Sequence, residues 1–446
     1  MSTPSRHINW AYALKESAIA GLVTLALFSV LLGISIYQNA YNDTIVKMRP
    51  ALLIGFSLFA AAFRFCVIIK QTFNTPALSH KKIGWFEKIE PHLQPILVGL
   101  MAFFPLIMLG LLGGQASTKW IDNYGIVIMI YIMLGWGLNI VVGLAGLLDL
   151  GYVAFYAIGS YTYALLAAHY GFSFWMALPV AGVMAALWGI VLGFPVLRLR
   201  GDYLAVVTMA FGEIIRAVAV NWRELTGGGA GISVPKITFF GLPFNANDDG
   251  FAAYFGLEFM PIHRSIFLYY VIFILAIIAA IITIKLKKLP LGRAWEALRE
   301  DEIACRSLGI NTRNTKLTAF AIGAMFGGLA GAFFGARQGF LTPESFSFEE
   351  SVLILATVVF GGMGSLTGVV LASIALFGGM EILREFSFIE QLIGIDPNRL
   401  RMLIVGLGMV LMMLWKPRGL ISTRTPTVFL KEQKSISGNL VKEGHG

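Results

Sequence analysis

Charge is what this sequence has least of. Charged residues make up 13% of its 446 residues, against about 25% in a typical soluble domain. Hydrophobic residues make up 57%, and the mean hydropathy is +0.75. This composition excludes a soluble globular chain and predicts a polytopic membrane protein. The formal net charge of +9 is typical of cytoplasmic loops in such proteins, so we do not infer nucleic-acid binding from it.

Cysteine and catalytic motifs are also scarce. The two cysteines are Cys66, in an apolar run, and Cys305, in a polar segment. Because these environments differ, we expect free thiols, with no disulfide framework and no zinc site. The chain has no HisGluXxxXxxHis, GlyXxxSerXxxGly or Walker motif, and the glycine run 227–229 is not followed by Lys-Ser/Thr. We therefore predict no catalytic residue and no metal site. If ATP drives this protein, another chain hydrolyses it.

Long apolar runs are abundant, and about 20 apolar residues suffice for a helix to cross the bilayer. The first run is long for a signal peptide and lacks a convincing cleavage site, so we interpret it as a retained transmembrane helix. Spans are predicted near residues 19–37, 51–69, 94–113, 124–147, 151–169, 176–197, 203–220, 266–284, 315–336, within 351–380, and 400–415.

The basic segments predict the orientation of these spans. Lysines and arginines gather in 70–92, 198–200, 285–316 and the C-terminal tail, which therefore belong on the cytoplasmic side. Strict alternation of spans satisfies this assignment up to residue 351. If 351–380 crossed once, the basic tail would lie outside. Its glycines permit a turn, so we favour two short pieces or two short spans, either of which returns the tail to the cytoplasm.

A second apolar run, 139–161, is also broken by glycines, at a similar place in an earlier group of spans. This correspondence predicts an internal repeat, and glycine-broken segments at matching positions indicate a translocation path. Close packing of helices through glycine is an equally common explanation. Asp149, at the first break, is expected to reach the interface or to cap the next helix. The candidate path residues are Gly143, Gly146, Asp149, Gly151, Gly361, Gly362 and Gly364.

Few ionisable residues lie within the spans. Glu213 and Arg216 are three apart on one helical face, which predicts an intramembrane ion pair. We favour a structural role for this pair over a substrate contact. No chain of carboxylates resembles a proton relay, which argues against a carrier driven by an ion gradient.

The charged segment from Lys285 to Lys316 lies between two long apolar runs. A helix is expected to begin near Arg293, after Pro290, and Gly309 supplies a stop signal. Small and apolar residues recur there at helical spacing: Ala294, Ala297, Leu298, Ala304, Cys305 and Leu308. The pattern predicts one short amphipathic helix, or a pair, that either lies on anionic lipid or docks into a groove on a cytoplasmic partner.

Residues 296–311 resemble the cytoplasmic coupling loop of ABC-importer permeases, in the form found in the branched-chain amino acid permease family. Segments 134–161, 201–216 and 361–368 also look like that family, in matching order and spacing, and together they span roughly 124 to 420. The first hundred or so residues are similar to the N-terminal extension of the longer, M-type subunit.

The resemblance implies an all-α polytopic fold, type II-like, with about 10–12 transmembrane helices, an internal repeat and glycine-broken helices. It implies an N-terminal extension (1–115) with about three spans, a permease core (116–420) with the coupling loop at 285–316, and a cytoplasmic tail (421–446). The coupling-loop residues would be Arg293, Ala297, Leu298, Glu300, Asp301, Ala304, Leu308 and Gly309.

The partners implied are a second, homologous permease, two cytoplasmic ATPase subunits that hold ATP and Mg, a periplasmic binding protein and membrane lipid. This chain would bind no cofactor, and it would lie in the bacterial inner membrane with its C-terminus and coupling loop in the cytoplasm. The substrate would be leucine, isoleucine or valine. The alternatives are an ABC permease for amides, urea or other amino acids, and an ion-coupled secondary transporter.

Overall fold

The computed structural model describes residues 10–38, 44–48, 50–73, 85–196, 199, 201–239, 241–247, 250–256, 258–379, 397–416 and 419–421. The chain divides into two compact units, Met1–Pro91 and His92–Gly446. The boundary between the units falls within the third helix, most of which lies in the second unit; an N-terminal extension that ends near residue 115 stays a prediction. The tail beyond residue 421 and the stretch 380–396 lie outside the described residues.

The first unit contains two helices and a β-hairpin. Its elements are α1 (Trp10–Gly33), β1 (Ile34–Gln38), β2 (Thr44–Met48) and α2 (Pro50–Phe73). The predicted helix 19–37 is wrong at its end, because residues 34–38 pair with β2 in antiparallel register. The segment alternates isoleucine with smaller or polar residues, a pattern that suits a strand. Arg64 of α2 forms an ion pair with Glu16 of α1 at 3.3 Å.

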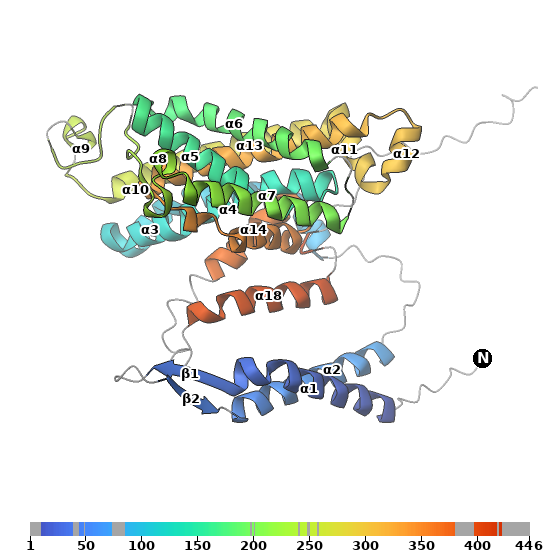
Figure 1. Ribbon diagram of the computed structural model, residues 1–446. Helices are drawn as coiled ribbons and strands as arrows, with labels where there is room; N and C mark the ends of the chain where they lie inside the picture. Colours follow the sequence, from blue (N-terminus) through green and yellow to red (C-terminus); the bar gives the residue numbers. More distant parts are fainter. Residues whose placement is uncertain are drawn as a thin grey trace, which may run out of the picture. The chain divides into compact units, whose positions relative to one another are not determined.

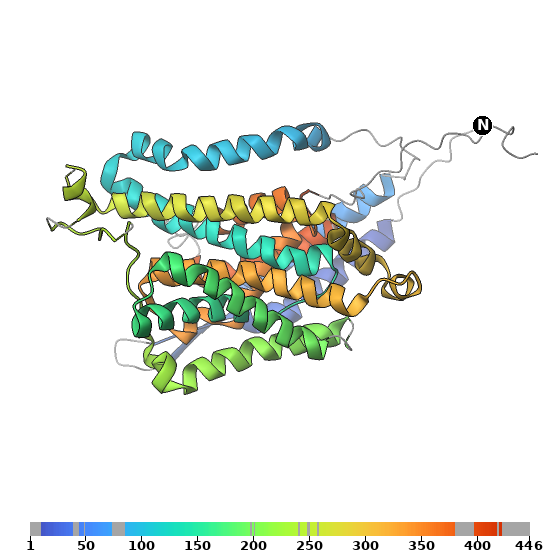
Figure 2. The same ribbon diagram turned by 90° about the horizontal axis from the view of Figure 1, so that it is seen from above.

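The second unit is a bundle of long helices (Figures 1 and 2). The helix α3 (Trp85–Lys119) is interrupted at Gly113. The other elements of the bundle are η1 (Trp120–Ile126), α4 (Val127–Leu138), η2 (Asn139–Leu144), α5 (Val153–Tyr170), α6 (Phe174–Val196), α7 (Asp202–Asn221), α10 (Ile262–Lys288), α13 (Thr312–Gln338), α14 (Phe348–Gly361), α15 (Leu366–Ser373), η5 (Ile374–Gly378) and α18 (Pro397–Trp415).

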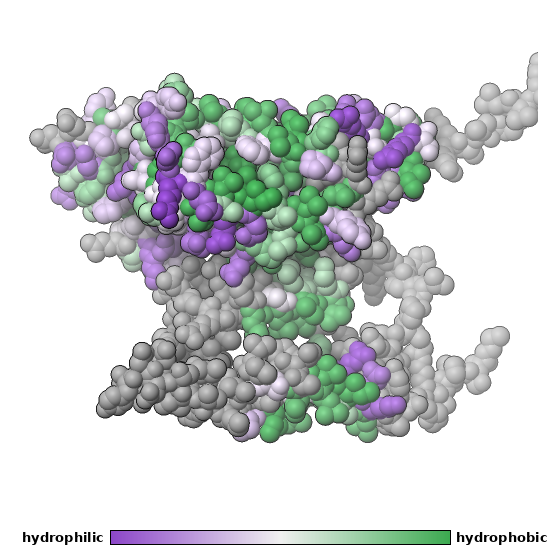
Figure 3. Space-filling view, viewed as in Figure 1, coloured by the Kyte–Doolittle hydropathy of each residue, from purple (hydrophilic) through white to green (hydrophobic). Residues whose placement is uncertain are grey.

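Short elements make up the two main connections, which lie at opposite ends of the bundle (Figures 1 and 2). One end holds α8 (Arg223–Thr226), η3 (Gly228–Ala230), β3 (Ile232–Ser233), α9 (Phe251–Tyr254), β4 (Phe340–Leu341) and η4 (Pro343–Phe346), where β3 pairs with β4. The other end holds α11 (Pro290–Glu300) and α12 (Glu302–Ser307). Figure 3 shows apolar side chains over the middle of this unit and polar side chains toward both ends.

Helix α13 forms the centre of the bundle, because it packs against both α5 and α6 through small residues. A Cβ on Gly159 of α5 would lie 2.4 Å from the Cα of Gly328 in α13. Only glycine permits this approach, and small residues are the usual means of bringing membrane helices together. Large buried side chains, including Phe320, Phe326 and Phe333, fill the remaining space.

Six helices within the described residues are long and apolar enough to cross a membrane: Leu93–Gly114, Ala116–Leu144, Phe174–Pro195, Asp202–Asn221, Ile262–Lys288 and Thr312–Gln338. They coincide with six of the predicted spans. Helices are also present at the remaining predicted positions. That α1, α2, α5 and α18 cross the membrane stays a prediction.

The segment 351–380 folds back on itself, as the sequence favoured. Helix α14 ends at Gly361. The next residues form a turn in which Gly362 and Gly364 have positive φ, and α15 then packs against α14. The start of the tail lies at this turn, because Leu420 N donates to Phe360 O at 2.8 Å. Lys287, where the polar segment begins, donates to Gly364 O at 3.2 Å. The tail therefore begins at the same end of the bundle as the polar segment.

Candidate functional site

The polar segment between α10 and α13 folds as two short helices, α11 and α12, which we call the loop helices. Asp301 separates them: it leaves the helical conformation, and its Oδ1 accepts hydrogen bonds from Ile303 N at 2.7 Å and Ala304 N at 3.0 Å. An acidic cap of this kind stabilises the first turn of a helix. Asp301 is exposed, and its side chain caps α12.

The stop predicted at Gly309 is confirmed. Its φ is +80°, a left-handed conformation that favours glycine. Gly309 N donates to Arg306 O at 3.1 Å, and Ile310 N donates to Cys305 O at 2.9 Å. This pair of hydrogen bonds is the Schellman arrangement, which ends a helix firmly.

Buried side chains fasten the loop helices to the start of α13. Trp295 is fully buried, and its Nε1 donates to Thr315 O at 3.1 Å and Thr318 Oγ1 at 3.3 Å. Lys316, itself buried, forms an ion pair with Glu302 of α12 at 3.1 Å. The loop helices are therefore held as a rigid extension of α13.

The single apolar face predicted for this segment is wrong. Leu298 and Cys305 point inward, whereas Ala304 and Leu308 are exposed. The break at Asp301 turns α12 relative to α11, so helical spacing does not carry across it. Leu308 is 80% exposed and Ile303 63% exposed. Large apolar side chains so exposed at a polar end of the molecule are typical of a docking surface.

The second side of the loop helices contacts both glycine breaks. Arg299 of α11 donates a hydrogen bond from Nη1 to Gly143 O, at the end of η2, at 2.5 Å. Asn139 of η2 accepts from Gly364 N at 2.8 Å, in the turn between α14 and α15. Lys287 donates to Gly364 O. We call these five residues the junction.

The junction has little free space. A Cβ on Gly146, whose φ is +71°, would lie 2.9 Å from Arg299 Cγ, and one on Gly143 would lie 2.5 Å from Gly364 N. The two breaks predicted to correspond thus meet each other and the loop helices. The glycines here serve close packing; that the candidate path residues line a translocation path stays a prediction.

Asp149 lies in the non-helical stretch that separates η2 from α5. It is fully buried, and its Oδ1 accepts from Gly151 N at 2.9 Å. Thr208 of α7 accepts from Leu150 N at 3.0 Å. The sequence predicted that Asp149 reaches the interface or caps the next helix. Both predictions are wrong, because the side chain is buried and does not cap α5. It satisfies the backbone of an extended segment enclosed by helices, where unpaired amides are costly.

The predicted pair of Glu213 and Arg216 is present. Arg216 lies 3.5 Å from Glu213 and 3.0 Å from Glu344 of η4. All three side chains are partly exposed within the protein. They connect α7 to the loop before α14, which supports the structural role.

Sequence reasoning missed six junction and anchoring residues: Asn139, Lys287, Trp295, Arg299, Glu302 and Lys316. Asn139 could have been found, because it is a lone amide in an apolar run. The others lie in a segment rich in charge, where nothing local distinguishes a contact from a solvated side chain. Among the residues that the structure describes, no group of His, Cys, Asp and Glu side chains could hold a metal ion.

The fold and the junction define a multi-pass α-helical membrane protein with interrupted helices, an arrangement typical of transport proteins. The chain belongs to the family described as "Branched-chain amino acid transport system / permease component", which matches residues 120–413.

Three relatives illustrate the similarity. The high-affinity branched-chain amino acid transport system permease protein LivM of Escherichia coli K12 is 55% identical over 309 residues, 68% of this chain and 70% of that protein. A probable LivM of Methanocaldococcus jannaschii is 25% identical, over 59% of this chain and 73% of that protein. LivH of Escherichia coli K12 is 26% identical, over 55% and 79%. No solved structure matches the chain significantly.

Proposed function

We propose that this chain is the membrane-spanning permease subunit of an ABC importer that moves leucine, isoleucine and valine into the cytoplasm. ATP and Mg are held by partner subunits, and this chain binds no cofactor. Support comes from membership of the permease family and from 55% identity to a protein named for high-affinity branched-chain amino acid transport.

The partners that we propose are a second permease, two cytoplasmic ATPase subunits and a periplasmic binding protein. Similarity to LivH as well as to LivM supports the second permease, because two related permeases are known by these names in one organism. The polar segment 285–316 and the start of the tail lie at one end of the bundle, and lysine and arginine outnumber the acidic residues in both. On the positive-inside rule we propose that this end lies in the cytoplasm and that the protein lies in the bacterial inner membrane.

The junction is the observation that carries the mechanism. The exposed side of the loop helices, with Ile303 and Leu308, receives the ATPase subunits. A displacement of this surface moves α13, because Trp295 and Glu302 of the loop helices bind it. It also moves the two glycine breaks, because Arg299 binds Gly143 O. Closure of the ATPase subunits around ATP thus biases the permease between two conformations.

Uptake into proteoliposomes tests the proposal. The complete complex is reconstituted with ATP inside or outside, and labelled leucine is added with the binding protein. We expect uptake only with ATP on the side of the ATPase subunits, and competition by valine and isoleucine. If urea competed with labelled leucine and valine and isoleucine did not, the proposed substrate class would be wrong. Uptake by this chain alone, driven by an ion gradient, would contradict the proposal.

A further inference from the structure

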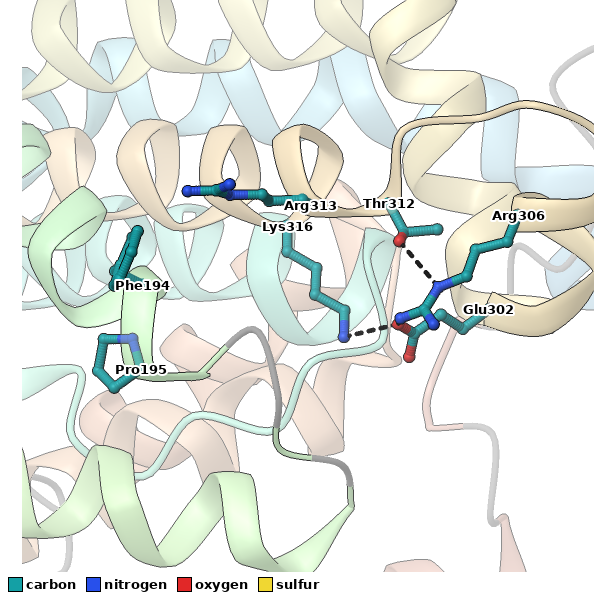
Figure 4. A pocket seen from close by; sticks show the side chains of 7 residues that line it. All are labelled: Phe194, Pro195, Glu302, Arg306, Thr312, Arg313 and Lys316. Carbon is teal, nitrogen blue, oxygen red and sulfur yellow. Dashed lines mark hydrogen bonds and ion pairs between the residues drawn. The ribbon is translucent and has the colours of Figure 1, made fainter.

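A polar pocket of about 570 Å³ lies where α6 ends and α13 begins (Figure 4). Three cationic side chains line it, Arg306, Arg313 and Lys316, together with one carboxylate, Glu302. Phe194 and Pro195 form the wall contributed by α6. This pocket is separate from the junction, and it shares with the anchoring of the loop helices only the ion pair of Glu302 with Lys316.

The charges that line this pocket are unequal. Glu302 is shared between two cations, Lys316 at 3.1 Å and Arg306 at 2.8 Å. The guanidinium of Arg313 lies over the ring of Phe194, 5.2 Å from its centroid. With three cations and one carboxylate, the lining carries two positive charges in excess.

The position of these cations adds to the excess of positive charge in the pocket. Arg313 and Lys316 lie in the first turns of α13, a helix of 27 residues. The N-terminus of a helix carries partial positive charge, so cations are disfavoured there and anions are favoured. Helix dipole and side chains therefore both favour a bound anion, and phosphate oxygens suit the planar donors of arginine.

The surface beside the pocket indicates where such an anion comes from. Leu187, Val191 and Phe194 share one face of α6 and are exposed by 51%, 56% and 61%. In a spanning helix this face meets acyl chains, and it leads directly to the pocket. An apolar stripe that ends at a cationic pocket, at the end of a membrane span, suits a lipid with a negatively charged headgroup.

We propose that this pocket binds the phosphate group of an anionic phospholipid, whose acyl chains lie along α6. Arg313 provides the principal contact, because Lys316 and Arg306 already share Glu302. The site goes beyond the transport function and does not depend on it, so binding can be measured on this chain without its partners.

Thermal unfolding of the purified full chain in detergent tests the site. Phosphatidylglycerol, phosphatidylcholine and inorganic phosphate are added in separate titrations, and native mass spectrometry counts the bound lipids. We expect stabilisation by phosphatidylglycerol alone. An equal effect of inorganic phosphate would show a free-phosphate site, and an equal effect of phosphatidylcholine would show unspecific lipid binding; either result overturns the assignment.

Three variants locate the binding. Arg313→Gln is expected to weaken phosphatidylglycerol binding about tenfold, the cost of one charged hydrogen bond, and Arg313→Lys should restore part of it. Lys288→Gln, which removes an exposed cation at the end of α10, is the matched control and should change little. Glu302→Gln frees two cations and should strengthen binding.

Equal losses in Arg313→Gln and Lys288→Gln would place the lipid elsewhere. Weaker binding in Glu302→Gln would contradict the proposed charge balance. If no lipid binds at all, the cations serve another occupant, such as an acidic segment of a partner protein, and the lipid assignment is wrong.

Discussion

Replacement of Gly143 by alanine is the sharpest structural test of the junction. The new Cβ would lie 2.0 Å from Asn139 Oδ1 and 2.5 Å from Gly364 N, far closer than non-bonded atoms approach. The Asn139 side chain can rotate away, although it then gives up its hydrogen bond to Gly364 N. The Gly364 amide is backbone, so the turn between α14 and α15 must itself move.

The size of the effect follows from these contacts. Overpacking costs about 1–3 kcal/mol, and the lost hydrogen bond about 0.5–1.5 kcal/mol. Part of this loss, about 0.5–1 kcal/mol, is offset because alanine loses less conformational entropy than glycine when it becomes helical. We therefore expect the free energy of unfolding to fall by about 1–3 kcal/mol.

Thermal unfolding of the purified protein in detergent measures this change. Gly110→Ala is the matched control, since a Cβ at Gly110 in α3 would meet nothing within 4 Å. We expect Gly143→Ala to unfold at a clearly lower temperature than Gly110→Ala. Indistinguishable unfolding temperatures would refute the contact between the two glycine breaks.

Two further predictions concern the loop helices. Trp295→Ala should lower the free energy of unfolding by about 3–5 kcal/mol and expose the loop to limited proteolysis, whereas Trp295→Phe should lose about 1–2 kcal/mol with the indole N–H; equal proteolysis of both variants would contradict the anchoring role. Burial, reinforced by two nearby carboxylates, raises the pKa of the Cys305 thiol, so in a Cys66→Ser background its reaction with maleimide should be slow. Because the thiolate reacts, the rate should rise with pH to a midpoint above the ordinary thiol value; a rate at neutral pH equal to that of the unfolded protein would disprove the burial.

Local sequence signals predicted the parts of the fold that depend on local chemistry. Apolar runs located the long helices, and the glycines of 351–380, weighed against the basic tail, predicted the turn at Gly361. The stop at Gly309 was predicted because a left-handed residue is a local requirement. The predicted helix 19–37 extended into the strand at 34–37, because isoleucines occur in membrane helices and in strands alike. Local signals do not separate the two in such a segment.

The junction could be predicted only in part, because its contacts join distant segments. Arg299 and Gly143 are 156 positions apart, and no periodicity relates them. Both glycine breaks were recognised, yet their meeting required the packing of η2 against the α14–α15 turn. The prediction of a single apolar face was wrong for a local reason: Asp301 ends one helix and caps the next, so helical spacing is not continuous across it.

The central claim is that the loop helices act on the permease through Arg299. It is tested most directly by the ratio of leucine taken up to ATP hydrolysed in proteoliposomes that contain the complete complex. We expect Arg299→Ala to retain hydrolysis while this ratio falls at least about tenfold, as loss of one charged hydrogen bond permits, and Arg299→Lys to recover part of it. The matched control is Lys285→Ala, which removes an exposed cation from the neighbouring helix α10. An unchanged ratio in Arg299→Ala, or an equal fall in Lys285→Ala, would contradict the account.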